Sequence, residues 1–122
     1  MKIRIKGNSI RIRLTKTEVE NFSKEGFIEE KTEFGNNDFS YRIESSTTHK
    51  ELTAAYIENR IVIYIPMAIA ENWISTDQVG FENKMDIGND KHLFLLIEKD
   101  FVCLDNTFED QTDNYPNPNA VC

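Results

Sequence analysis

Five basic side chains near the start of the chain form the pattern with the clearest chemical meaning. They alternate with isoleucines in two short runs, and they are Lys2, Arg4, Lys6, Arg11 and Arg13. Alternation with a period of two indicates β-structure with one apolar face and one cationic face. Such a face could bind a phosphate, a nucleotide or an acidic peptide, because guanidinium and ammonium groups form charge-assisted hydrogen bonds to oxyanions. The candidate ligand-binding residues are Arg4, Lys6, Arg11 and Arg13.

A structural role competes with ligand binding for these bases. Acids on neighbouring strands could neutralise them as cross-strand partners, and the candidates are Glu29, Glu33, Glu44 and Glu58. The chain has 21 acidic residues against 14 Lys and Arg, so such partners are abundant. We therefore expect ion pairing within the fold to occupy most of this face, with ligand binding as the alternative.

The path of the chain through the basic residues has two solutions. A tight hairpin centred on Gly7-Asn8 pairs the isoleucines of the two runs with each other. It also sets Arg4 opposite Arg11 and Lys2 opposite Arg13, and facing like charges destabilise a ladder. One long strand with a glycine bulge avoids that repulsion when acidic strands flank it. The sequence leaves both paths open.

The two cysteines, Cys103 and Cys122, are the next candidates for chemistry. They could be free thiols, a disulfide, ligands of a metal ion or intermolecular links. Eighteen residues separate them, whereas paired cysteines of a zinc site usually lie about two to four residues apart. His92 is too far from Cys103 along one extended strand to share an ion with it, whereas the spacing leaves His49, in an earlier polar loop, unconstrained. We predict no metal and no cofactor, with a metal site at the two cysteines as a weak alternative.

Catalytic motifs are absent from the sequence. It contains no G-x-S-x-G, phosphate-binding loop, G-x-G-x-x-G or H-E-x-x-H pattern. Its two histidines both stand in polar segments, so the sequence gives no specific support for a Cys–His or Ser–His pair. We predict no catalytic residue, and the balance favours a protein that is not an enzyme.

Net charge and hydropathy exclude two classes of partner. The formal net charge is −7 and the isoelectric point about 4.8, which disfavours nucleic acid. The basic strands also carry isoleucine where a single-strand binder has aromatic residues. No apolar stretch approaches the ~20 residues of a membrane span, and the start lacks the apolar block of a secretory signal. We expect a cytoplasmic protein that binds neither nucleic acid nor membrane.

One helix is predicted from its two ends. Thr15 and Glu18 form a T-x-x-E capping box, in which each side chain bonds the other residue's backbone N–H. The amphipathic segment that follows ends near Glu25, and Gly26 suits the left-handed position after a helix. Phe27 is then expected to fold back against the apolar side of the helix.

The rest of the chain predicts short strands and a second helix. Residues 61–65 are the most continuously apolar run and indicate a central strand. Pro66 suits the start of a helix over 67–73. Residues 83–91 read as a polar turn or loose hairpin tip, and 92–104 begin as a last core strand. Without regular βαβ alternation or an internal repeat, the fold class is α+β, mainly an antiparallel sheet with two short helices.

The length of 122 residues predicts one domain, which we place at residues 1–104. Residues 105–122 form an acidic C-terminal tail with four acids and no base, whereas the first sixteen residues have six bases and no acid. Opposite charges attract, so we expect the tail to pack on the domain.

Several stretches resemble a family of small uncharacterised bacterial proteins. They are MKIRIKGNSIRIRLT at the start, STDQVGFE in the middle, and EKDFVCLD and DNYPNPNAVC near the end. The resemblance covers essentially the full length and implies a bacterial, cytoplasmic, single-domain protein. It transfers no functional residue, because that family has no established activity.

Together these features predict a non-catalytic interaction or assembly module that binds a protein partner or forms a homo-oligomer. The alternative is a small-anion (phosphate-type) binding protein or enzyme that uses the basic N-terminal strand face.

Overall fold

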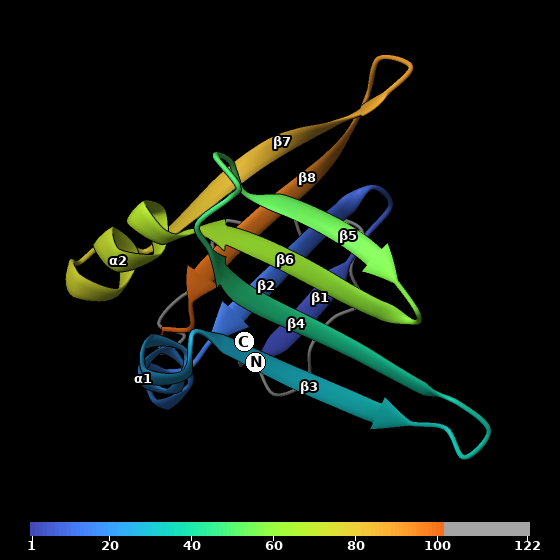
Figure 1. Cartoon of the computed structure of the whole chain (residues 1–122), viewed down its shortest axis with the longest axis horizontal. Coiled ribbons are helices and arrows are strands. Elements are labelled where there is room, and N and C mark those ends of the chain that lie inside the picture. Colours follow the sequence, from blue (N-terminus) through green and yellow to red (C-terminus); the bar gives the residue numbers. More distant parts are fainter. Residues whose placement is uncertain (102–122) are drawn as a thin grey trace, which may run out of the picture.

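The computed structural model describes residues 1–101, which form eight strands and two helices. In chain order they are β1 (Lys2–Ile5), β2 (Ser9–Leu14), α1 (Lys16–Glu25), β3 (Phe27–Glu33), β4 (Asp38–Ser46), β5 (Thr53–Ile57), β6 (Arg60–Pro66), α2 (Met67–Ser75), β7 (Gly80–Gly88) and β8 (Lys91–Lys99). Two four-stranded sheets result, with strand order β1-β2-β8-β7 in sheet A and β3-β4-β6-β5 in sheet B (Figure 1). The acidic tail 105–122 and both cysteines lie outside the described residues.

The α+β class is confirmed, but the expectation of a mainly antiparallel sheet needs correction. There are two sheets and both are mixed, because the central pair of each, β2–β8 and β4–β6, is parallel. Only the outer pairs are antiparallel. Parallel neighbours cannot be joined by a tight turn, so they come from segments that a local sequence pattern does not connect. Strand periodicity indicates that a segment is extended, but not which way its partner runs.

Of the two paths considered for the first residues, the chain takes the hairpin. Ile5 lies opposite Ile10, and Arg4 lies opposite Arg11. The Lys6 N–H donates to the Ser9 carbonyl at 3.0 Å across the turn. The isoleucines of β2 are buried in the core, and a shift of one residue would expose them. Burial of the apolar face therefore holds the register despite the facing bases.

Helix α1 begins and ends as the sequence predicts. The Glu18 N–H donates to Thr15 Oγ1 at 3.3 Å, and Glu18 Oε1 accepts from the Thr15 N–H at 2.8 Å. Gly26 follows the helix at φ 82°. The expected packing of Phe27 on the helix is wrong: Phe27 opens β3, is 39% exposed, and lies under the Arg42 guanidinium at 3.9 Å from its ring centre.

The hairpin β7–β8 is longer than the sequence indicates. Strand β7 continues to Gly88, and only Asn89 and Asp90, both at positive φ, form the turn. The polar residues of β7 have weak strand propensity, but they pair along their length with the apolar strand β8. Pairing with a buried strand overrides local propensity.

The two halves of the described chain repeat one topology that the sequence does not reveal. Each half has a hairpin, a helix and a second hairpin: β1-β2-α1-β3-β4 and then β5-β6-α2-β7-β8. Exchanging the halves converts the strand order of sheet A into that of sheet B. Each sheet therefore combines the first hairpin of one half with the second hairpin of the other.

Equivalent residues of the two halves form equivalent hydrogen bonds and are buried alike. The Asn8 carbonyl accepts from the Phe94 N–H at 3.0 Å, and the Asn59 carbonyl accepts from the Ser40 N–H at 3.1 Å, so both links join a turn to the parallel neighbour. Fully buried isoleucines occupy the same register in the two parallel pairs: Ile12 opposite Ile97, and Ile63 opposite Ile43. The repeat therefore extends to individual positions.

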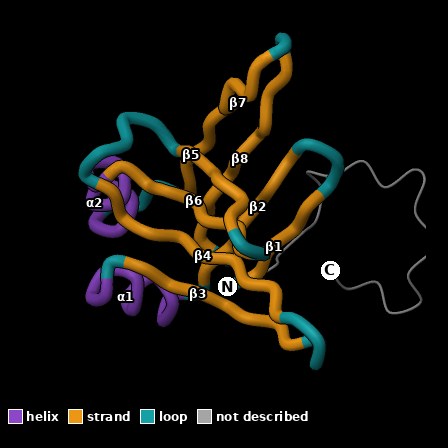
Figure 2. The backbone as a smooth tube through the Cα atoms, turned by 45° about the vertical axis from the view of Figure 1, so that its right-hand side comes forward, coloured by secondary structure: helices purple, strands orange, loops and turns teal. Residues whose placement is uncertain are grey.

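The core lies between the two sheets and is covered at one end by both helices, which lie side by side at the left of Figure 1 and of Figure 2. Trp73 of α2 is fully buried and packs edge to face against Phe22 of α1 and Phe81 of β7. Its indole N–H donates to the Val79 carbonyl at 3.1 Å. The opposite end carries the hairpin turns and has no helix over it in the described part of the chain (Figure 1).

Candidate functional site

The five predicted bases lie together on the outer face of sheet A, which we call the basic face: Lys2, Arg4, Lys6, Arg11 and Arg13. The β1–β2 register places Lys2 beside Arg13 and Arg4 beside Arg11, and Lys6 follows at the turn. Ile10 and Ile12 belong to the core and Ile3 packs against it, so the bases that alternate with them project outward. The hairpin thus brings together all of the residues that the sequence singled out for binding.

Two of these bases form ion pairs with the C-terminal end of sheet A. Arg13 Nε lies 2.6 Å from Glu98 Oε1, and Lys2 Nζ lies 3.3 Å from Asp100 Oδ2. Lys2 and Arg13 are largely or half exposed, so each pair contributes little stability. The pairs nevertheless hold the end of β8 against the first hairpin.

The neutralising acids proposed from the sequence are the wrong ones. Glu29, Glu33 and Glu44 belong to sheet B, and Glu58 lies in the β5–β6 turn. None of these four acids forms an ion pair with the basic face within the described residues, because β2 pairs with β8 and not with β3. Partner choice depends on strand order, which alternation of residue types does not encode.

Sheet B has its own ionic cluster on its outer face. Arg60 Nε lies 3.0 Å from Glu29 Oε1, and Arg42 Nε donates to Glu44 Oε1 at 3.0 Å. Glu29 Oε1 is buried and makes no hydrogen bond of good geometry, so the two arginines neutralise it mainly by charge. Acids and bases compensate each other here, which is typical of a structural cluster.

Lys6 and Arg11 differ from the paired bases of the basic face. Among residues 1–101, neither has an acidic side chain within ion-pair distance. Arg11 is half-buried and Lys6 is exposed. A half-buried guanidinium without a carboxylate partner favours an anion from outside the described residues.

Apolar side chains adjoin the bases on the same outer face. Leu96 lies beside Arg11, and Phe94 lies beside Ser9 in the next row. Both are half-buried although they face away from the core. The sequence predicted a last core strand here, and its run of five apolar residues does not show which side chains face outward. The surface therefore combines cationic groups with an apolar strip.

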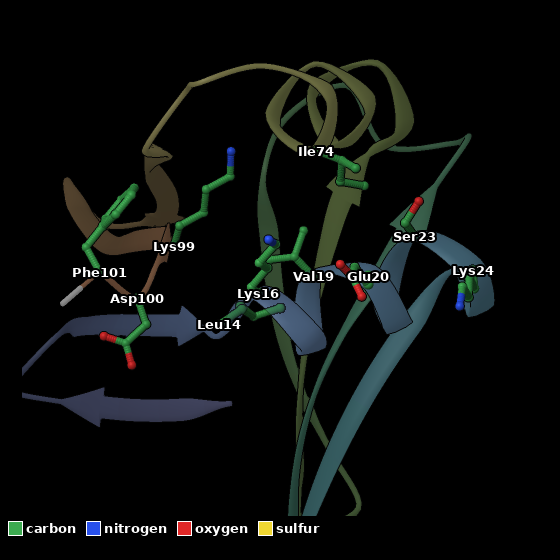
Figure 3. Close-up of a pocket in the computed structure, with 10 residues that line it drawn as sticks. All are labelled: Leu14, Lys16, Val19, Glu20, Ser23, Lys24, Ile74, Lys99, Asp100 and Phe101. Atoms are coloured by element: carbon green, nitrogen blue, oxygen red, sulfur yellow. The ribbon is translucent and has the colours of Figure 1, made fainter.

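A separate groove lies where α1, α2 and the end of β8 meet (Figure 3). It has a volume of about 600 Å³, and Leu14, Val19 and Ile74 give it an apolar floor. Lysines and acids also line it, and Phe101, the last described residue, lies at one end (Figure 3). The volume suits a small ligand, but none of Arg4, Lys6, Arg11 and Arg13 lines it.

The structure gives no grouping for metal chemistry among residues 1–101: no three His, Cys, Asp or Glu side chains converge there. His49 stacks on Tyr64 with ring centres 4.3 Å apart, and its Nδ1 lies 2.7 Å from Ser46 Oγ. Neither described helix is long and apolar enough to cross a membrane.

Comparison with known proteins places the chain in a family but does not provide a function. No curated protein and no solved structure matches the chain. A family profile described as a family of unknown function, DUF7009, matches residues 1–119. The expected membership in a family of uncharacterised proteins is thereby confirmed, and the chain belongs to the DUF7009 family of unknown function.

Proposed function

We propose that the protein is a non-catalytic interaction module and that its basic face binds an extended acidic segment of a protein partner. The observation that carries this proposal is the position of Arg11: half-buried, flanked by Arg4 across the hairpin and by Leu96 on β8. A segment that alternates acidic and apolar residues would match the rows of bases and the strip of Phe94 and Leu96.

The shape of the surface favours a segment over a small anion. A phosphate site needs several donors that converge on one point. Here the bases follow two neighbouring strands of a sheet, where directly opposite residues lie ~5 Å apart and the next outward residue along a strand is ~7 Å away. The groove and its lysines lie elsewhere. Phosphate binding by Arg4, Lys6, Arg11 and Arg13 therefore remains the second candidate, supported only by their charge.

The proposal is tested by fluorescence anisotropy with the full chain and a labelled peptide of alternating Glu and Leu. We expect saturable binding at low ionic strength that weakens as salt screens the charges. Lys6→Glu combined with Arg11→Glu is expected to abolish binding. Inorganic phosphate, added as a competitor at equal ionic strength, should not displace the peptide.

The matched control reverses the same number of charges away from the basic face. Lys24→Glu with Lys50→Glu changes two exposed lysines of α1 and of the β4–β5 connection. This variant should bind the peptide as the parent does, apart from a modest effect of net charge. Equal loss in both double variants, or no binding by the parent, would remove the proposal. Light scattering with and without these changes shows whether a second copy of the chain is the partner.

A further inference from the structure

A second surface, distinct from the basic face, lies at the end of sheet B remote from the helices. There the β3–β4 turn and the end of the β5–β6 hairpin border a shallow cavity of about 280 Å³ that is open to solvent. Its walls include three aromatic rings, Phe34, Phe39 and Tyr56. The other lining residues are polar: Asn36, Asn37, Asp38 and Asn59. We call this cavity the aromatic pocket.

Two of the rings are unusually exposed. Phe34 and Tyr56 are each 66% exposed, which leaves large apolar surfaces in water. Single exposed apolar residues scattered over a surface are ordinary. Exposed aromatic groups that gather around one cavity are instead typical of a binding site. The third ring, Phe39, is half-buried and packs on Tyr41, with ring centres 6.4 Å apart.

The fold itself does not require aromatic residues at these positions. At the equivalent end of sheet A, Ile87 occupies the position that matches Phe34, and Ile5 the position that matches Tyr56. Both isoleucines are also exposed, at 46% and 53%. The same topology therefore forms with aliphatic side chains, and the rings of the aromatic pocket need another reason.

Backbone hydrogen bonds hold the polar lining in place. The Phe34 N–H donates to the Asn37 carbonyl at 3.0 Å, and Asn37 Oδ1 accepts from the Asp38 N–H at 2.9 Å. The Asn59 carbonyl is fixed by Ser40. The carboxamides of Asn36 and Asn59 form no hydrogen bond within residues 1–101, and they retain both donors and acceptors for a ligand.

The charges around the aromatic pocket favour a neutral ligand. Asp38 is in the lining, and its carboxylate pairs with Lys31 Nζ at 3.9 Å. Glu58 precedes Asn59 in the turn, and Glu33 precedes Phe34. Among residues 1–101 the lining contains no lysine or arginine, and Arg60, which follows Asn59, pairs with Glu29 at 3.0 Å. A nucleotide or nucleic acid would stack on the same rings, but its phosphates would meet carboxylates, so this class is disfavoured.

We propose that the aromatic pocket binds a neutral carbohydrate. The negative faces of Phe34 and Tyr56 attract the C–H groups of a pyranose ring, much as they attract the positive edges of other rings. The asparagine carboxamides donate to and accept from its hydroxyl groups. Rings and amides supply the two kinds of contact that a sugar offers, on a frame that needs little rearrangement.

The test is a titration of the isotopically labelled full chain, followed by NMR, with three neutral oligosaccharides: maltotetraose, cellotetraose and triacetylchitotriose. At millimolar concentrations we expect at least one of them to shift the amide signals of the β3–β4 and β5–β6 turns in a saturable way. The signals around Ile5 and Ile87 should stay in place. If none of the three shifts the turns, or if all regions shift alike, the proposal is overturned.

Paired variants use the repeat as an internal control. Phe34→Ile with Tyr56→Ile gives the aromatic pocket the side chains of the equivalent positions, and binding should weaken about tenfold or more. Ile5→Ala with Ile87→Ala changes the equivalent end, and affinity should not change. Thermal unfolding confirms that each variant is folded. Unchanged affinity after loss of both rings would contradict the proposal even if an oligosaccharide binds.

Discussion

Phe22 and Trp73 meet edge to face, with ring centres 6.4 Å apart and an interplanar angle of 63°, and they occupy equivalent positions in the two halves of the repeat. Each lies about one helical turn after a smaller buried residue of the same helix: Phe22 follows Val19, and Trp73 follows Ala70. The contact therefore joins the two halves where the helices cover the core. Helix α2 also contacts β4 of the first half, and strands of the two halves pair in both sheets.

Mutation of this pair should reveal a measurable coupling. Phe22→Leu and Trp73→Phe each remove ring contacts while keeping an apolar side chain. In a double-mutant cycle we expect a coupling of about 0.5–1.5 kcal/mol in the free energy of unfolding, because edge-to-face rings attract beyond their buried area. Urea unfolding of the parent and the three variants gives this value. Simple additivity would show that each ring acts only through its own burial.

The capping box should contribute to stability on its own. Thr15→Ala removes the acceptor of the Glu18 N–H and is expected to lower the free energy of unfolding by about 1 kcal/mol. Ser23→Ala is the control, since Ser23 is exposed in the interior of the same helix and alanine favours helix there. Equal midpoints of denaturation for Thr15→Ala and the parent would contradict a stabilising role of the cap.

The β7–β8 turn predicts a stabilising substitution. Asn89 and Asp90 both have positive φ, at 54° and 58°, which is the backbone of a hairpin turn that favours Asn-Gly. Asp90→Gly should therefore raise the free energy of unfolding by roughly 0.5–1 kcal/mol.

Gly35→Ala tests the same role of positive φ in the opposite direction, by replacing a glycine. Gly35 has φ 91°, and no atom lies within 4 Å of the position that a Cβ would take, so alanine there is strained by its backbone alone. It should destabilise the protein while Asp90→Gly stabilises it. The same sign for both substitutions would show that positive φ is not the controlling factor.

Tyr41 should make stability depend on alkaline pH. Burial raises the pKa of its hydroxyl above the ordinary value of 10.0, and the nearby charge of Glu30 raises it further. The unfolded chain therefore ionises Tyr41 at lower pH than the folded chain. This contribution to stability is complete below about pH 10 and is lost as pH rises through the higher pKa of the folded state.

Tyr41→Phe isolates that contribution. The hydroxyl also donates to the Met1 carbonyl at 2.9 Å, so at neutral pH the variant should be less stable than the parent by about 0.5–1.5 kcal/mol. Above pH 10 the difference should narrow, because only the parent has this phenol to ionise. Urea unfolding over a series of pH values measures it. A difference that stays constant would contradict the raised pKa.

Local features could be derived from the sequence because their interactions span only a few residues. The capping box of Thr15 and Glu18, the left-handed Gly26 and the alternation of Ile3 and Ile5 with bases each depend on near neighbours. The candidate binding residues followed from the same alternation. Only the choice between hairpin and bulge stayed open, since burial of Ile10 and repulsion between Arg4 and Arg11 act in opposite directions.

Tertiary structure alone decided what these segments meet. The parallel pairing of β2 with β8 gives Arg13 its partner Glu98 and sets Leu96 beside Arg11. The folding of two turns toward each other brings Phe34 to Tyr56. Such contacts join residues that are far apart in the chain. Burial of apolar faces stabilises them, but many different strand orders would bury the same faces, so the sequence pattern does not select one order. The sequence by itself thus determined which residues are basic, buried or at a turn, and the strand order determined which surfaces they form.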